Sequence, residues 1–303
     1  MTTDSTTQRR EVPRADGPGR APNSTEFEYS DGDFERVRRI IYEEAGIKLG
    51  DSKRTMAYSR LVRRVRALGM HRFSDYLDLV EKHGESERKA FVNALTTNLT
   101  AFFREPHHFP ILENYLAPRH ARRPAVIWCA GCSTGEEAYS IAMTLSAASI
   151  ASGAHILATD VDTNVLETAE RGVYALERIE NLPHGYKERF FLEGIGRKAG
   201  QVMVRPEIKS LVTFRQVNLL ESSWPLRAPL DAIFCRNVMI YFDKPTQYAV
   251  LDRFAELLEP GGLLFAGHSE NFTQGRIPFR SRGRTVYERQ LGRGSSPYAA
   301  GRG

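Results

Sequence analysis

The stretch "AVIWCAGCSTGEEAYSIAM", residues 125–143, joins a short apolar run to a turn of small residues and then to a helical pattern. Three further apolar runs alternate with helical patterns downstream of it, namely "HILATD" (155–160), "LDAIFC" (230–235) and "GLLFAG" (262–267). Short apolar runs that alternate with helices are typical of buried parallel strands. The sequence therefore predicts an α/β fold built on a doubly wound, Rossmann-like sheet.

The turn in this stretch lies where a doubly wound sheet binds its ligand. Small residues after the first strand let the backbone approach the ligand at the carboxyl ends of the strands, and Gly131 and Gly135 are two such residues. They are followed by Glu136 and Glu137, whose carboxylates would repel the pyrophosphate of a dinucleotide. S-adenosylmethionine carries a sulfonium, an ammonium and no phosphate, so the turn favours this cofactor.

The same turn contains a Cys-x-x-Cys pair, Cys129 and Cys132. A redox pair needs exposed thiols at the start of a helix, whereas Cys129 falls inside the apolar run and Cys132 lies beside acidic residues. A zinc site needs a second pair, and Cys235 is the only other cysteine in the chain. We interpret both cysteines as small core and turn residues and predict no metal site.

The residues before this alternation have a helical period instead. A first helix is predicted from apolar residues at helical spacing, with caps before it and glycines after it. These residues are Phe34, Val37, Ile40 and Ile41, the caps Ser30 and Asp31, and the stop signals Gly46 and Gly50. The segment "DSKRTMAYSRLVRRVRALG" (51–69) predicts a second helix, with Leu61, Val65 and Leu68 facing the core. Two more helices are predicted in 73–84 and 86–98.

These patterns divide the chain into five parts. They are a disordered tail (1–26), a small all-α domain (27–95), a linker (96–123), the sheet domain (124–290) and a second disordered tail (291–303). Within the sheet domain an antiparallel β-subdomain is predicted at about 190–215, because "GQVMVRPEIKSLVTFRQVN" (200–218) has the pattern of a hairpin. The segment "FRSRGRTVYERQ" (279–290) predicts a closing antiparallel pair.

Composition narrows the class of protein. The chain has 303 residues, a formal net charge of +5 and a pI near 9.1, which suggests an acidic partner. No apolar run approaches the roughly 20 residues that span a bilayer, and the first residues lack the apolar segment of a secretory signal. We therefore expect a cytoplasmic protein whose cysteines remain thiols and which does not insert into a membrane.

Side chains downstream of the turn agree with the cofactor interpretation. Asp160 ends the second apolar run, where its carboxylate can accept hydrogen bonds from ribose hydroxyls. Asp162 is predicted to cap the next helix. Asn218 would present an amide near the adenine edge. His107 and His108 are predicted to cap a helix start and pack there, rather than to act in catalysis.

Several long motifs resemble those of chemotaxis receptor glutamate methyltransferases of the CheR type. They are "TTNLTAFFREPHHFP" (96–110), "STGEEAYSIAM" (133–143), "VNLL" (217–220), "LDAIFCRNVMIYFD" (230–243) and "GLLFAGHSEN" (262–271). The resemblance covers residues 28–290. It implies a helical amino-terminal domain joined to an S-adenosylmethionine-dependent methyltransferase domain with a small β-subdomain.

The resemblance also implies site residues. The cofactor residues are Asn98, Thr100, Arg104, Glu137, Asp160, Asn218, Leu219, Cys235 and Arg236. Glu136 stays an alternative to Glu137. Arg104 and Tyr241 are expected near the transferred methyl group. The implied reaction gives a glutamyl methyl ester, and because a free glutamate with a pKa near 4.3 is already ionised at neutral pH, no general base is needed.

The implied substrate is the cytoplasmic domain of a chemotaxis receptor. The basic helix would dock it through Lys53, Arg54, Arg60, Arg63, Arg64 and Arg66, because its methylation sites are glutamates. Arg60 with Arg64, and Arg63 with Arg66, are predicted to form exposed neighbouring rows of this helix. The turn "GIGRKAG" (194–200) has glycines at Gly194, Gly196 and Gly200. This pattern resembles that of family members which bind a receptor carboxyl-terminal peptide as an added strand. We expect a monomer.

Three other functions fit the sequence less well than glutamate methylation. The pI and the fold suggest a nucleic-acid methyltransferase, but the chain lacks an Asn or Asp followed by Pro-Pro and an aromatic residue, so no nucleic acid partner is predicted. A non-catalytic cofactor sensor is disfavoured because all the cofactor positions are present. A nicotinamide dehydrogenase is disfavoured by the carboxylates in the turn.

Overall fold

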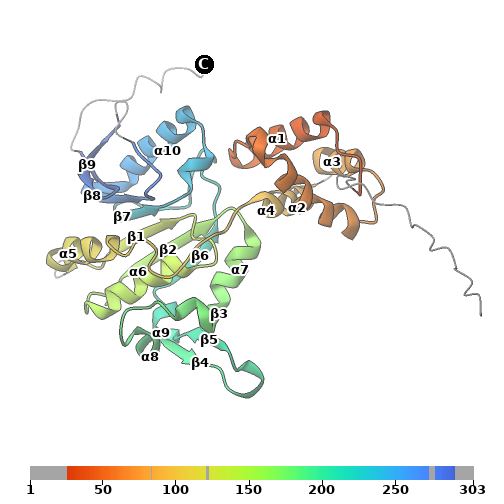
Figure 1. Ribbon diagram of the computed structural model, residues 1–303. Coiled ribbons are helices and arrows are strands. Elements are labelled where there is room, and N and C mark those ends of the chain that lie inside the picture. The colour runs from red at the N-terminus through yellow and green to blue at the C-terminus, as the bar shows by residue number, and fades with distance from the viewer. Residues whose placement is uncertain (1–25, 83, 121–122, 273–276, 291–303) are drawn as a thin grey trace, which may run out of the picture.

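The computed structural model describes residues 26–82, 84–120, 123–272 and 277–290. Figure 1 shows three parts: a helical body of α1–α4 to one side, a large sheet with its helices, and a small sheet at the bottom of the view. Apart from Glu26, the two predicted disordered tails lie outside the described residues. No helix in the described ranges combines the length and apolarity needed to cross a membrane.

The amino-terminal body consists of α1 (Asp31–Ala45), η1 (Asp51–Lys53), α2 (Arg54–Ala67), α3 (Phe73–Lys82) and α4 (Glu85–Leu95). The start of α1 is a capping box, in which the side chains of Ser30 and Asp33 accept each other's backbone N–H. The helix ends at Gly46, whose φ of 68° is the left-handed conformation that glycine adopts without strain. The four predicted helices are present, and Ser30 and Gly46 are the caps of α1 among the four predicted signals. The last helix ends at Leu95 rather than at residue 98.

One predicted core residue of this body is wrong. Leu68 is 40% exposed, whereas Leu61 and Val65 are fully buried. The reason is that α2 ends at Ala67, and Leu68 is its C-cap with a ψ of 0°. Helical periodicity therefore no longer determines where this side chain points.

The large sheet contains β1 (Val126–Ala130), β2 (His155–Asp160), β6 (Val212–Gln216), β7 (Leu230–Cys235), β8 (Leu258–Ala266), β9 (Phe279–Gly283) and β10 (Val286–Arg289). Their order is β6-β2-β1-β7-β8-β10-β9. The first five strands are parallel, and β10 pairs antiparallel with both β8 and β9. The doubly wound fold and the closing pair are confirmed. The strand order reverses between β1 and β7, and ligands of such sheets bind at this point.

Helices cover the sheet on both faces. They are α5 (His108–His120), α6 (Glu136–Ala147), α7 (Thr163–Arg171) and α10 (Lys244–Leu257). Along β1, Ile127 and Cys129 belong to the apolar cluster shared with α5 and α6, whereas Trp128 belongs to the cluster shared with Phe254 of α10. Successive side chains of a strand point to opposite faces. The strand is therefore buried on both sides, as its continuous apolar run predicts.

The small sheet differs in its strands from the predicted β-subdomain. It has the order β3-β5-β4, from β3 (Val173–Ala175), β4 (Phe191–Glu193) and β5 (Gln201–Val204), with short helices η2 (Leu176–Ile179), α8 (Tyr186–Phe190), η3 (Gly196–Lys198) and α9 (Pro206–Lys209). The hairpin predicted over 200–218 is wrong, because α9 separates β5 from β6 and β6 pairs with β2 of the large sheet. The antiparallel hairpin is formed by β4 and β5, around residues 194–200.

Candidate functional site

The turn after β1 is fixed by backbone contacts. The N–H groups of Gly131 and Cys132 both donate to the carbonyl of Thr159, each at 2.8 Å. Gly131 has a φ of 80°, and a Cβ on it would lie 2.3 Å from a methyl carbon of Val238. Gly135 has a φ of 96° and starts α6. The turn thus packs closely against the loop after β7, at the point where the strand order reverses.

Asp160 lies at the carboxyl end of β2, beside this turn. Its carboxylate accepts from the N–H of Ser133 (2.8 Å) and from the N–H of Asp162 (3.0 Å). Burial raises the pKa of Asp160 to about 6, and the two N–H donors oppose this rise. Asp162 caps α7 by accepting from the N–H of Asn164, as predicted.

Both glutamates of the turn are buried, and each is compensated by an arginine. Glu137 accepts from Nη1 of Arg236 through Oε2 (2.6 Å) and from the thiol of Cys129 through Oε1 (3.4 Å). Glu136 accepts from Arg178 of η2 through Oε1 and from the hydroxyl of Thr134 through Oε2. Because a thiol is a weak donor, Oε1 of Glu137 is the carboxylate oxygen best able to accept a further hydrogen bond.

Arg236 ties the end of β7 to the linker. It is 5% exposed, and its Nη2 donates to the carbonyl of Arg104 at 2.6 Å. The same nitrogen lies 3.6 Å from Oε2 of Glu105. The Arg104 side chain, in turn, donates from Nη1 to the carbonyl of Leu99 at 3.0 Å. The structure therefore brings Glu137, Arg236 and the Arg104 segment together at one edge of the sheet.

The linker residues Asn98 and Thr100 join the same group. Asn98 donates from Nδ2 to Oδ2 of Asp162 (2.9 Å), and its carbonyl accepts from the hydroxyl of Ser133 (3.3 Å). The carbonyl of Thr100 accepts from Nη2 of Arg178 at 2.8 Å. The linker is thereby held between the turn after β1, the start of α7 and the small sheet.

Three predicted site residues lie further along this edge. Asn218 donates to the carbonyl of Glu44 in α1 (2.6 Å), and it is the one predicted cofactor residue that lines a charged cavity of about 510 Å³ between α1, α4 and the end of β6. Leu219 is buried in the cluster shared with α10. Tyr241, in η4 (Met239–Tyr241), packs against the clusters of both domains, and its carbonyl accepts from the N–H of Lys48.

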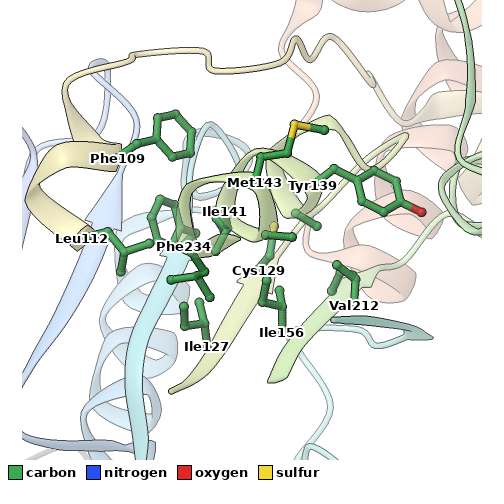
Figure 2. Close-up of a cluster of buried hydrophobic side chains, with 14 of the residues drawn as sticks. Phe109, Leu112, Ile127, Cys129, Tyr139, Ile141, Met143, Ile156, Val212 and Phe234 are labelled. Carbon is green, nitrogen blue, oxygen red and sulfur yellow. The ribbon is translucent and has the colours of Figure 1, made fainter. Parts of the chain in front are cut away.

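Both cysteines of the turn and Cys235 are free and buried. Burial raises the pKa of each of the three thiols well above the usual value. Figure 2 shows Cys129 on β1 among apolar side chains that include Ile127, Ile156 and Ile141 of α6. This packing supports the interpretation of Cys129 as a core residue.

The histidines lie at the start of α5. His108 is fully buried and begins this helix, and its Nε2 lies 3.0 Å from the carbonyl of Arg284. Burial lowers the pKa of His108 to about 4, so it is neutral at physiological pH. Glu105, His107 and His108 place possible metal-ligand atoms within 4.8 Å of one another. The guanidinium of Arg236 beside Glu105 opposes a cation there.

Sequence reasoning missed two residues that hold the site. One is Arg178, which joins Glu136 to the linker. The other is Glu270, which is 3% exposed and accepts from the N–H groups of Asn237 (2.9 Å) and Gly267 (2.6 Å), so that it ties the loops after β7 and β8 together. The signal for Glu270 was an acidic residue close after a buried strand. Arg178 had no comparable local signal.

The basic helix differs from its prediction. Arg60 and Arg64 are half-buried, so the prediction that they form an exposed row is wrong. Nη1 of Arg60 donates to the carbonyls of Leu95 (3.0 Å) and Thr96 (2.7 Å), and Arg64 binds the carboxylate of Glu87 at 2.7 Å. The reason is that α2 packs against α4. The carbonyls at the C-terminus of α4 lie beside Arg60, and Glu87 in the first turn of α4 lies beside Arg64.

Other charges of the helix are also compensated. Arg54 pairs with Asp31 and Arg66 pairs with Glu26, both from outside the helix. Lys53 and Arg63 are exposed and form no ion pair with any residue in the described ranges. The free positive charge of the helix is therefore smaller than its composition indicates.

The open sheet, with acidic groups in place of a phosphate-binding turn, has the fold of an S-adenosylmethionine-dependent methyltransferase, and comparison with known families shows this class. Residues 98–287 match the family described as CheR methyltransferase, SAM binding domain, and residues 32–96 match the CheR methyltransferase all-alpha domain. The chain belongs to the CheR methyltransferase family. The predicted fold, cofactor and family are confirmed.

Relatives of known name agree with this assignment. The chain is 52% identical to the chemotaxis protein methyltransferase of Klebsiella aerogenes over 277 residues, which are 90% of this chain and 95% of that protein. It is 53% identical to chemotaxis protein methyltransferase 2 of Pseudomonas aeruginosa, over 86% of this chain and 94% of that protein. It is 51% identical to the chemotaxis protein methyltransferase of Escherichia coli, over 85% of this chain and 91% of that protein.

Proposed function

We propose that the enzyme transfers the methyl group of S-adenosylmethionine to γ-carboxylates of glutamate side chains in chemotaxis receptors, giving glutamyl methyl esters. The observation that carries the proposal is the convergence of the linker, the turn after β1 and the Glu137–Arg236 pair at the switch point of the sheet. In this proposal Asp160 accepts from the ribose hydroxyls and Oε1 of Glu137 accepts a further donor of the cofactor. Asn98, Thr100, Asn218, Leu219 and Cys235 line the remaining cofactor surface.

The reaction brings a carboxylate anion to a sulfonium cation and leaves two neutral products. Alignment of the attacking oxygen, the methyl carbon and the sulfur in a site with little water supplies most of the rate, because the nucleophile is already ionised. Arg104 orients a carboxylate, and Tyr241 lines the path of the methyl group. Arg236 acts indirectly, since it is buried and holds the Arg104 segment in place.

The test uses cofactor labelled in its methyl group and a cytoplasmic fragment of a receptor. We expect label to appear on the fragment and to be released as methanol by mild base, as methyl esters are. Base-stable label, or label on nucleic acid added in competition, would contradict the proposal. Cofactor binding without any transfer would favour a sensor instead.

The raised pKa of Asp160 gives a pH dependence of cofactor binding. With its pKa raised to about 6, the carboxyl is largely ionised at neutral pH and becomes protonated as pH falls through that value. If the carboxylate is the acceptor of the ribose hydroxyls, the Kd of S-adenosylmethionine should rise as pH falls below that value, by up to about tenfold per pH unit. Calorimetry between about pH 5 and 8 measures this dependence. The Asp160→Asn variant should show weaker binding and a flat profile, and the same slope in both proteins would contradict the role.

We propose that Lys53, the residue before α2, and Arg63 of α2 attract the acidic receptor. Both side chains are exposed and have no acidic partner in the described ranges, so they remain available to a substrate rich in glutamates. Four other arginines contribute less to this surface, because each already binds a nearby carboxylate or carbonyl. They are Arg54, Arg60, Arg64 and Arg66.

Lys53→Glu with Arg63→Glu is expected to raise the KM for receptor several-fold, with unaltered cofactor affinity and unaltered melting temperature. Added salt should reduce the difference from wild type, because exposed charges are screened beyond about 8 Å at physiological ionic strength. The matched control is Arg60→Glu with Arg64→Glu, which should lower thermal stability because both side chains hold α2 against α4. An unaltered KM at low salt would exclude this helix as the docking surface.

We also propose that a receptor carboxyl-terminal peptide adds as a strand to the β-subdomain, at the outer edge of β4. Leu192 of β4 and Met203 of β5 are directly opposite each other and exposed, which provides an apolar surface beside this edge. Titration with receptor tail peptides should shift the amide signals of residues 191–193. Shifts confined to other elements would place the peptide elsewhere.

We propose further that the enzyme works as a monomer in the cytoplasm. Sedimentation can test the oligomeric state, and cell fractionation can test the location.

A further inference from the structure

The linker segment before α5 alternates between buried and exposed residues. Thr96, Asn98 and Thr100 are partly buried and Phe102 is buried, whereas Thr97, Leu99 and Ala101 are exposed. A period of two is that of an extended chain, in which successive side chains point to opposite sides. The segment therefore has an inner side and an outer side, and Leu99 belongs to the outer side with 77% of its surface exposed.

The exposure of Leu99 does not come from a loose backbone. Three successive carbonyls, those of Asn98, Leu99 and Thr100, each accept a hydrogen bond from a side chain. The donors are Ser133 of the turn after β1, Arg104 of the linker itself and Arg178 of the small sheet. Single exposed apolar residues are common on protein surfaces. The backbone around Leu99, however, is held by hydrogen bonds from the turn after β1, from η2 and from the linker itself.

The inner side carries the residues proposed to contact the cofactor, Asn98 and Thr100, so a bound cofactor leaves Leu99 facing outward. The outer side continues into the basic helix, because the hydroxyl of Thr97 accepts from Nη1 of Arg60 (3.3 Å). A partner that lies along α2 therefore reaches Leu99 on the same surface.

We infer that Leu99 is a substrate-contacting residue that packs against an apolar side chain of the receptor helix, beside the glutamate that is methylated. This inference rests on the proposed function. The partner that fits is an amphipathic helix, whose carboxylates lie near Lys53 and Arg63 and whose apolar positions cover Leu99. Such a helix has apolar residues three and four positions apart, next to acidic ones. Leu99 thus contributes to the choice of which glutamate is methylated.

The experiment compares Leu99→Ser with wild type in steady-state methylation of a receptor cytoplasmic fragment. We expect the KM for receptor to rise by about tenfold, the effect of losing most of one buried leucine contact. The Kd of S-adenosylmethionine and the melting temperature should stay unchanged, since the side chain points away from the inner side. Leu99→Met should restore the KM to near the wild-type value, because methionine keeps an apolar side chain of similar volume.

Two outcomes would overturn the inference alone. An unaltered KM for Leu99→Ser shows that the side chain does not contact the receptor, and an equal loss of cofactor affinity shows that it serves the cofactor instead. If the wild-type enzyme itself does not methylate the fragment while it binds cofactor, the proposed function fails first, and this inference fails with it. The wild-type arm therefore distinguishes the two failures.

Discussion

The Arg236→Met variant is expected to lose about 3–5 kcal/mol of the free energy of unfolding. The wild-type guanidinium is buried and donates to the carboxylate of Glu137 and to the carbonyl of Arg104. Methionine fills much of the same volume but leaves the buried carboxylate of Glu137 without its cationic partner, which is the costly part of breaking a buried ion pair. Urea denaturation at neutral pH measures the loss.

The matched control removes both charges. Glu137→Gln with Arg236→Met should recover a large part of the stability, because the buried side chain at position 137 is then neutral. Recovery should be incomplete, since Glu105 still loses the guanidinium that lies 3.6 Å from its Oε2. Both variants should bind S-adenosylmethionine poorly, since the Arg104 segment loses the contact that holds its backbone. A double variant as unstable as the single one, or a single variant within about 1 kcal/mol of wild type, would contradict this account of the pair.

The Arg104→Ala variant is expected to lower the rate of methyl transfer by about 100-fold, because small errors in the alignment of reacting groups have effects of this size. The substitution removes the hydrogen bond to the carbonyl of Leu99 and the positive charge at the linker, but it keeps the backbone carbonyl that Arg236 uses. Stability should therefore change little. Single-turnover measurements at saturating cofactor separate the chemical step from binding.

Arg104→Lys provides the control for charge without geometry. Lysine keeps the positive charge but not the planar fork that holds a carboxylate or a carbonyl at fixed distance, so its rate should lie between those of wild type and Arg104→Ala. A folded Arg104→Ala enzyme with a near-normal single-turnover rate would rule out the proposed role. An equal effect of both variants would show that geometry, rather than charge, accounts for the whole loss.

The sequence by itself determined the elements whose signals are local. Ser30 and Gly46 bound α1, and Asp162 caps α7, because a cap needs only residues within one helical turn. The continuous apolar runs predicted the parallel strands, since a strand buried on both faces has apolar residues at every position. The turn "CAGCSTGEE" indicated the cofactor class through the charge of its own residues.

Only the tertiary structure decided which distant groups meet. Arg64 and Arg66 of α2 are compensated by Glu87 and Glu26, which lie far from them along the chain. Residues 212–216 join the large sheet rather than a hairpin, because β6 pairs with β2 and Val212 is buried there. Ion pairs and strand partners of this kind arise from packing between segments far apart in sequence, and neither hydrophobic period nor turn chemistry carries information about them. The fixed, outward position of Leu99 has the same origin in part, since Ser133 and Arg178 hold the neighbouring carbonyls of Asn98 and Thr100 from distant parts of the chain.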